Sequence, residues 1–82
     1  MVRKLWRIRS ASGVIVSCAV SELVGARYLL TVMWDDRRLF QELHTRLTDV
    51  AVRADYIKSL LMGDDWTELP IDNDDPHRPE ES

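Results

Sequence analysis

The sequence has a single cysteine, Cys18, among its 82 residues. One cysteine cannot form a disulfide within the chain, which excludes the cross-linked framework of many small secreted domains. Long apolar runs are also missing, because the basic segment from Met1 to Ser10 is followed by runs too short and too interrupted for a signal peptide or a membrane span. We therefore expect a cytoplasmic protein that does not enter a membrane.

Residues that carry chemistry are scarce as well. The three glycines are dispersed, so the sequence has no glycine-rich phosphate loop. A zinc site needs three or four ligands, and apart from carboxylates the chain offers Cys18, His44 and His77. Cys18 lies inside the apolar run "VIVSCAV", where a thiol is not activated for nucleophilic attack. We expect no catalytic residue, no metal and no cofactor, and therefore no enzyme.

Acidic and basic residues separate along the chain. The first 46 residues hold eight Lys and Arg against four Asp and Glu, a net charge of +4, whereas residues 47–82 hold three against ten, a net charge of −7. A basic half can face an anionic partner, and an acidic tail can compete for the same surface. Two solvated faces of opposite charge would give the same pattern.

The length of the chain suits one small domain. With 82 residues it buries too little surface to be very stable alone. Because disulfides cannot compensate, a second copy of the chain is the simplest source of further buried surface. We therefore expect a homo-oligomer, most simply a homodimer.

Three segments have the pattern of β-strands. Residues 2–10, "VRKLWRIRS", alternate bulky and charged side chains and end at "SASG", which is typical of a turn. Residues 14–20, "VIVSCAV", are rich in β-branched side chains, residues 26–34, "ARYLLTVMW", are the most strand-like, and Gly25 allows a turn between them. Alternation then places one set of side chains on a common face: Trp6, Ile8, Val14, Val16, Cys18 and Val20.

Residues 37–44, "RRLFQELH", fit two structures. A long helix beginning at Asp35 would have a good N-cap and apolar residues near heptad spacing from Leu39 to Leu61, which would give three strands and a coiled-coil-like dimer seam. Alternatively, the aspartates form a hairpin turn, and residues 37–44 form a fourth strand with Leu39 and Leu43 on its inner face. The local pattern does not decide between them.

Three short segments resemble a group of short, functionally uncharacterised bacterial proteins: "LWRIR" at residues 5–9, "YLLTVMWDD" at 28–36 and "YIKSLLMGDDW" at 56–66. Those proteins begin with an LWR-type strand, carry an aliphatic strand that runs into an Asp-Gly hairpin, and finish with a helix ending near Gly-Trp. This chain departs from them at two places, because Asp36 replaces the turn glycine and two aspartates follow Gly63 before the tryptophan. The resemblance implies the hairpin, an order of four strands and then a helix, and no known activity.

We predict an α+β fold: a four-stranded antiparallel sheet, arranged as a meander, followed by one C-terminal helix packed on one face. The helix runs from Thr48 to Met62 and stops at Gly63. Residues 1–69 form this single ββββα domain. Residues 70–82, "PIDNDDPHRPEES", have the proline and acid content of a disordered tail.

The predicted helix carries two apolar stripes. One covers the sheet: Val50, Ala54, Ile57 and Leu61. Val52, Tyr56 and Leu60 lie roughly opposite and form a candidate dimer or partner stripe. Either another molecule covers this second stripe, or the segment around Trp66 folds back over it.

The outer face of the sheet is the other candidate surface. If Leu39 and Leu43 point inward, this face carries apolar residues such as Leu5 beside basic and aromatic ones. The candidate binding face is Arg7, Arg9, Arg27, Arg38, Phe40 and His44. We predict a non-catalytic small interaction module that binds protein. The alternative is single-stranded nucleic-acid binding, in which cations track phosphates and aromatic rings stack on bases, as the similar element order of the whirly class of dimeric single-strand-binding domains implies.

Overall fold

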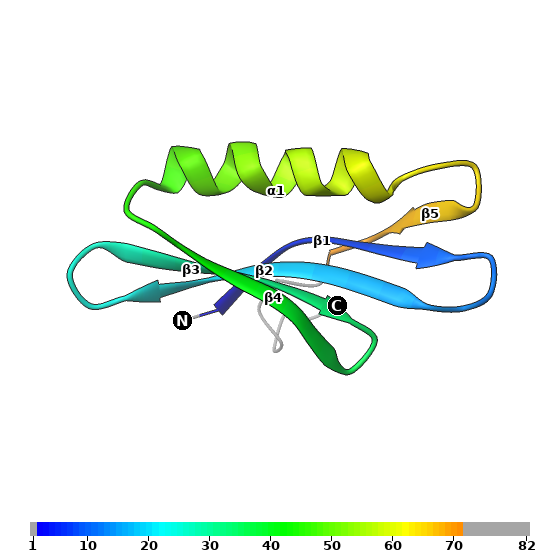
Figure 1. Ribbon diagram of the computed structural model, residues 1–82, viewed down its shortest axis with the longest axis horizontal. Coiled ribbons are helices and arrows are strands. Elements are labelled where there is room, and N and C mark those ends of the chain that lie inside the picture. The colour runs from blue at the N-terminus through cyan, green and yellow to red at the C-terminus, as the bar shows by residue number, and fades with distance from the viewer. Residues whose placement is uncertain (1, 72–82) are drawn as a thin grey trace, which may run out of the picture.

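Five strands and one helix make up residues 2–71, the part of the chain that the structure, a computed structural model, describes. The elements are β1 (Val2–Ser10), β2 (Ile15–Leu23), β3 (Arg27–Trp34), β4 (Arg37–His44), α1 (Leu47–Leu61) and β5 (Trp66–Leu69). Neighbouring strands pair antiparallel in the order β4-β3-β2-β1-β5, and α1 lies across one face of the sheet (Figure 1). The predicted α+β class and the meander of four strands followed by a helix are confirmed, and β5 is a fifth strand that the prediction lacks.

A tight turn joins β3 to β4. Trp34 pairs with Arg37, which leaves Asp35 and Asp36 as a two-residue turn. Asp35 has a left-handed backbone with φ of 55°, which aspartate tolerates better than most residues. Its carboxylate accepts a hydrogen bond of 3.0 Å from the Ile15 amide, and its own amide donates to the Ile15 carbonyl. The hairpin prediction is confirmed, and the long-helix alternative is wrong.

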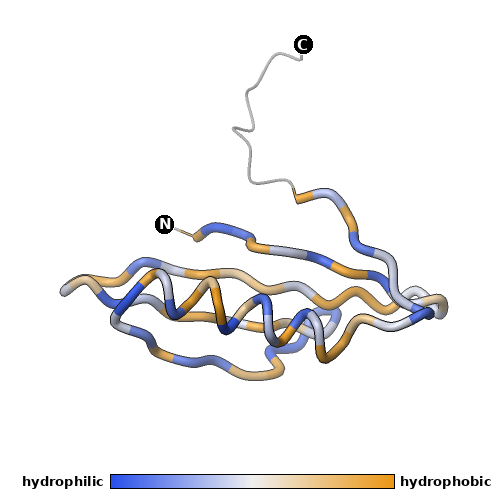
Figure 2. The backbone as a smooth tube through the Cα atoms, turned by 90° about the horizontal axis from the view of Figure 1, so that it is seen from above, coloured by the Kyte–Doolittle hydropathy of each residue, from blue (hydrophilic) through white to orange (hydrophobic). Residues whose placement is uncertain are grey.

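The hydrophobic core lies between α1 and the sheet. Hydrophobic and hydrophilic segments are interspersed along the backbone (Figure 2), and the strand side chains that are buried are those that face α1. The buried residues are Trp6, Ile8, Val16, Cys18, Val20, Leu30, Val32, Val50, Ala54 and Ile57. Trp6 also ties the sheet to the helix, because its indole Nε1 donates a hydrogen bond of 2.9 Å to the Ala54 carbonyl oxygen. The inward set predicted for the first two strands is confirmed, with Val14 packed at its margin.

A β-bulge interrupts β1. Lys4 pairs with Ala19 and Trp6 pairs with Cys18, so Leu5 is an extra residue between the two pairs. Leu5 packs against the core on the α1 side. The prediction that it lies on the outer face is therefore wrong, because the bulge breaks the alternation at that point.

A second irregularity lies in the pairing of β3 with β4. Val32 pairs with Phe40 and the next residue, Met33, pairs with Arg38, which leaves Leu39 as the extra residue. Phe40 therefore lies on the same side as buried Val32 and packs against the core. From Phe40 onward, every side chain of β4 is on the face opposite to the one that simple alternation from the turn would give.

This shift overturns the predicted faces of β4. Leu39 and Leu43, predicted to point inward, are 51% and 53% exposed. Phe40 and His44, predicted to point outward, lie on the α1 side, where His44 pairs with Tyr28. The prediction was wrong because a single extra residue moves each later side chain to the other face of the sheet.

Strand β5 returns the chain to the edge of β1. Its residues pair with the last four residues of β1, from Arg7 to Ser10. Trp66 packs against the core, and its ring meets that of Trp34 edge-on with centroids 6.0 Å apart. The segment around Trp66 therefore does not cover the outer stripe of α1, and that alternative is wrong. Of the predicted tail, residues 72–82 lie outside the described residues.

Helix α1 begins and ends one residue before its predicted limits. Arg46 is the N-cap residue, and its side chain makes no capping hydrogen bond. At the other end the Met62 amide donates to the Lys58 carbonyl, and the backbone of Met62 is already extended. No helix within residues 2–71 has the length and apolar character needed to cross a membrane.

Candidate functional site

The face of the sheet that points away from α1, called the open face below, is covered by no other element of residues 2–71 (Figure 1). The pairing registers identify its side chains, because they alternate with the buried ones. Its basic residues are Lys4, Arg7, Arg9, Arg27 and Arg38. The four arginines of the candidate binding face thus lie on one surface.

The sheet separates the charges of its strands. None of the described strand residues that point to the open face is acidic. The strand acids Glu22, Glu42 and Glu68 point to the α1 side, where Glu42 binds Arg53 and Glu68 binds Lys58. The other acids within residues 2–71 lie in turns or on α1. A chain with a net charge of −3 therefore presents one face that is basic.

Aliphatic side chains are interspersed on the open face with the basic residues and with polar ones such as Ser17 and Thr31. The aliphatic residues are Ile15, Ala19, Leu29, Met33 and Leu43. Leu29 pairs directly with Leu43, so the two side chains are close neighbours. Aliphatic side chains mixed with arginines are typical of protein interfaces.

Two of the arginines are held in place by polar contacts. Arg38 donates from Nη1 to Gln41 Oε1 at 3.2 Å, and Gln41 donates from Nε2 to Thr31 Oγ1 at 3.1 Å. Arg7 donates from Nη2 to the Pro70 carbonyl oxygen at 3.1 Å, and its buried Nε has no hydrogen-bond partner within the described residues. Side chains that are already ordered lose less conformational entropy when they bind a partner.

The predicted aromatic members of this face do not join the arginines. Phe40 and His44 lie on the α1 side, and no aromatic residue of the described strands points to the open face. Single-stranded nucleic-acid binders stack bases on aromatic rings. The open face offers cations and aliphatic contact, and within the described strands it offers no such ring.

On the α1 side, Glu42 links β4 to the helix. Arg53 donates from Nε to both carboxylate oxygens at 3.0 and 3.1 Å and from Nη2 to Oε2 at 2.8 Å. His44 Nε2 lies 3.1 Å from Glu42 Oε1. The hydrogen bonds from Arg53 are the main reason that the pKa of Glu42 is lowered; partial burial opposes this effect and His44 adds to it. Arg53 therefore ties α1 to β4 through Glu42, and His44 contacts the same carboxylate from within β4.

The pairing of Glu42 predicts a pH-dependent loss of stability. Because its pKa is lower in the folded than in the unfolded chain, its contribution is complete above the ordinary glutamate value of about 4.3 and disappears as the pH falls through the lowered folded value. Glu42→Gln should lower the free energy of unfolding by up to about 1 kcal/mol near neutral pH. Thermal melts followed by circular dichroism should show this difference shrinking in acid, and a difference that is unchanged in acid would contradict the assignment.

The outer stripe of α1 is exposed as predicted from its spacing. Val52, Tyr56 and Leu60 are 71%, 52% and 65% exposed, whereas Val50 on the inner stripe is buried. The Arg53 guanidinium lies over the Tyr56 ring, 5.5 Å from its centroid, which orients that ring. The stripe is therefore apolar surface on a well-formed helix. None of the described residues buries it, so a partner could bind there.

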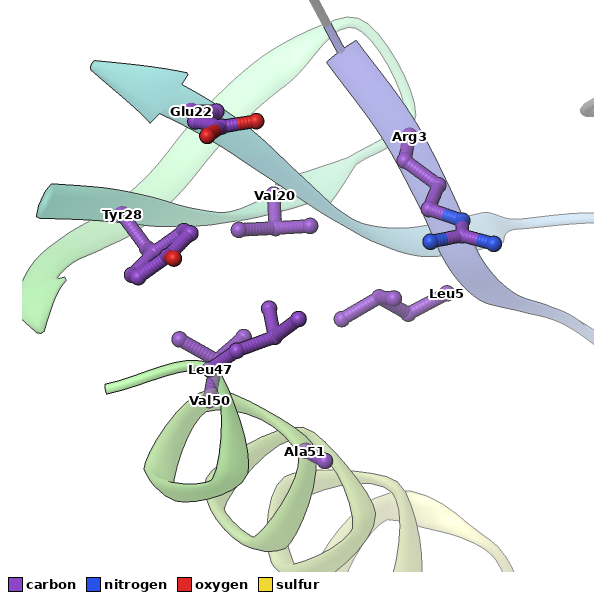
Figure 3. Close-up of a pocket in the computed structure, with 8 residues that line it drawn as sticks. All are labelled: Arg3, Leu5, Val20, Glu22, Tyr28, Leu47, Val50 and Ala51. Atoms are coloured by element: carbon purple, nitrogen blue, oxygen red, sulfur yellow. The ribbon is translucent and has the colours of Figure 1, made fainter. Parts of the chain in front are cut away.

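A hollow of about 290 Å³ lies between the start of α1 and the ends of the central strands. Figure 3 shows Leu5, Val20 and Tyr28 pointing toward one another across it. Arg3 and Glu22 contribute the charged groups of its lining, and both are exposed. The described residues around the hollow include no cysteine, histidine, serine or threonine. The hollow is therefore an incompletely filled part of the edge of the core.

The single thiol is inert in this fold. Cys18 is fully buried, and burial raises its pKa to about 12, with a smaller contribution from the negative charge of Glu42. The reactive thiolate is therefore negligible at neutral pH. Within residues 2–71, no three His, Cys, Asp or Glu side chains come together in a way that could hold a metal ion, and His77 lies outside that range.

Comparison with known proteins adds no further information. No protein-family model, curated protein or solved structure matches the chain. The resemblance to short bacterial proteins with an LWR-type strand therefore stays a prediction. Function has to be argued from the open face and the outer stripe of α1.

Proposed function

We propose that this chain is a non-catalytic interaction module whose open face binds an acidic, partly apolar segment of another protein. The observation that carries the proposal is the sorting of charge, which leaves five basic side chains among aliphatic ones with no acid among the described strand residues of that face. Basic residues attract an acidic partner and set its orientation. The aliphatic side chains supply apolar contact area that stabilises the complex.

Two features favour a protein over single-stranded nucleic acid as the partner. Five aliphatic side chains lie on the face among the basic residues, and a phosphate backbone would gain little from them. The described strands also offer no aromatic ring there on which a base could stack. Nucleic-acid binding is therefore treated as an alternative outcome of the test.

Reversing two charges of the open face should abolish most of the binding. We expect Arg9→Glu combined with Arg38→Glu to weaken binding of a fluorescein-labelled peptide of glutamate and leucine residues by about tenfold or more, because two attractive contacts become repulsive. Fluorescence anisotropy measures this affinity. The matched control is Arg37→Glu combined with Arg46→Glu, since Arg37 pairs with Trp34 on the α1 side and Arg46 precedes α1.

The outcomes of this titration are distinct. Equal affinity of the two double variants for the peptide would contradict the proposal. Binding of a thymidine oligonucleotide as tight as that of the peptide, with a steep dependence on salt, would replace it with the nucleic-acid alternative. A peptide in which lysine replaces glutamate should not bind.

We also propose that the chain forms a homodimer through the outer stripe of α1. The stripe is symmetric about Tyr56, so an antiparallel second copy would set Val52 against Leu60 and the two Tyr56 rings near each other. Burying an exposed aliphatic side chain of this size contributes about 1.5–3 kcal/mol. Such a dimer leaves both open faces accessible.

A cytoplasmic location stays a prediction from the single cysteine.

A charge in the stripe should dissociate this dimer. We expect Val52→Glu to raise the dimer dissociation constant by about tenfold or more, because two glutamates would then face apolar surface of the partner. Light scattering across a range of protein concentrations measures it, at low and at high salt, and salt should have little effect on the parent dimer. Val24→Glu is the control, because Val24 is 92% exposed in the turn between β2 and β3 and is not part of the stripe. A parent protein that is monomeric throughout would contradict the proposal.

A further inference from the structure

We propose that residues 72–82 bind across the open face of their own chain and compete there with the protein partner. This inference rests on the proposed function, because it names what regulates the same surface. Three observations support it: the place where the described chain ends, the length of the segment, and its charge.

The described chain ends beside the open face. Strand β5 pairs with β1 at the edge of the sheet, and Leu69 pairs with Arg7 on the side away from α1. Arg7 then donates its hydrogen bond to the Pro70 carbonyl oxygen at 3.1 Å. Because the Arg7 side chain belongs to the open face, this bond directs the chain toward that face, and Asp72 follows two residues later.

The segment is long enough to cross the sheet. The eleven residues from Asp72 to Ser82 span up to about 36–40 Å when extended, at about 3.3–3.6 Å each. Neighbouring strands lie about 4.8 Å apart, so the distance from β5 to β4 across the sheet is about 19 Å. The segment can therefore reach from Arg7 on β1 to Arg38 on β4 with length to spare.

Its charge complements the open face. The segment holds five acids, Asp72, Asp74, Asp75, Glu80 and Glu81, against the single Arg78. The open face holds five basic residues, and the acidic side chains of the strands all point the other way. A second copy of the open face would bring like charges together, which disfavours direct pairing of two such faces. The acidic segment at residues 72–82 has the opposite charge to the open face and belongs to the same chain.

Tethering makes this contact effective at any protein concentration. A short linker holds a segment at an effective concentration on the order of millimolar, so weak charge contacts suffice to occupy the face. A partner then binds only the fraction of molecules in which the face is uncovered, and its apparent affinity falls by that fraction. The acidic segment would therefore set the affinity of the module without touching the partner.

Neutralising the segment in the full chain tests the competition. The variant carries Asp72→Asn, Asp74→Asn, Asp75→Asn, Glu80→Gln and Glu81→Gln. If the face is covered most of the time, this variant should bind the glutamate–leucine peptide about three- to tenfold more tightly than the parent, and the difference should disappear at high salt. The control neutralises two acids of α1, on the other side of the sheet, with Asp49→Asn and Asp55→Asn, and should leave the affinity unchanged.

A spin label locates the segment directly. Ser82→Cys introduces the one reactive thiol, because Cys18 is fully buried with a pKa of about 12. A nitroxide there should broaden the amide signals of Arg9, Ser17 and Thr31 more than that of Val52 on the far side of α1. In a mixture of spin-labelled protein and isotope-labelled protein without the nitroxide, the broadening should be absent, because the contact is within one chain.

The results separate the two proposals. If neutralisation changes nothing and no selective broadening occurs, the segment does not cover the face, while peptide binding that depends on Arg9 and Arg38 still supports the proposed function. If the broadening occurs but the peptide binds neither protein, the covering is supported and the proposed partner chemistry is overturned. Broadening in the mixed sample would show that the segment binds another copy and would overturn the contact within one chain.

Discussion

Replacing Trp6 with alanine should lower the free energy of unfolding by about 3–5 kcal/mol, the largest effect of any single change considered for this chain. Trp6 is 3% exposed and lies at the centre of β1 against α1. The substitution removes the largest side chain of the core and leaves a cavity in its place. It also removes the 2.9 Å hydrogen bond from the indole to the Ala54 carbonyl. Denaturant titration followed by far-ultraviolet circular dichroism measures the loss. The free energy of unfolding of a small domain is only about 5–15 kcal/mol, so this variant should unfold at a much lower temperature than the parent.

Trp34 provides the matched control for Trp6. It lies on the same side of the sheet but at its margin, where its main ring contact is with Trp66 at 6.0 Å. Trp34→Ala should therefore lower the free energy of unfolding by only about 0.5–1.5 kcal/mol. Trp6→Phe separates the two contributions of the indole, because it keeps most of the buried ring and removes the donor. If Trp6→Ala lowered the free energy of unfolding no more than Trp34→Ala does, the described packing of α1 on β1 would be contradicted.

Truncation of Leu30 should lower the free energy of unfolding by about 2–5 kcal/mol, the second largest effect expected. Leu30 is fully buried in β3, paired with Val20 on one side and Glu42 on the other. Alanine at this position leaves a cavity between the sheet and α1 that the paired strands cannot collapse to fill. Denaturant titration again measures the loss.

The control for Leu30 is the leucine that the sequence pattern places in the core. Leu43 is about as apolar, yet it lies on the open face, and Leu43→Ala should change the free energy of unfolding by less than about 1 kcal/mol. The pair of variants thus tests the register of β4. A loss at Leu43 as large as that at Leu30 would mean that β4 pairs without the extra residue at Leu39.

The strands and most of the core could be predicted because their signals are local. Two local patterns specify extended strands: alternating bulky and charged residues in β1, and dense β-branched residues in β2. The buried set then follows because every second side chain of a strand points to the same face. Asp35 and Asp36 supply the two-residue turn that joins β3 to β4. Each of these features depends on residues a few positions apart.

The bulges could not be predicted because an extra residue has no local signature. Leu39 and Leu43 are spaced as an inner face of β4 would require, and the pattern gives no sign that Leu39 is unpaired. As a result, Phe40 and His44 were assigned to the binding face while the four arginines were placed correctly on one surface. Strand β5 has four residues, too few for a period to be recognised.

The short length of β5 has a consequence for how the protein behaves in a crowded solution. Because β5 covers β1 only from Arg7 to Ser10, no strand of residues 2–71 pairs with the outer edge of β1 before Arg7. Unpaired edges recruit strands from other molecules and lead to aggregation, unless charge or irregular backbone prevents it. Arg3 and Lys4 lie on this stretch, and the extra residue Leu5 distorts it. The charged and irregular N-terminal stretch of β1 thus opposes edge-to-edge growth of the sheet, while β5 pairs with the last four residues of the strand.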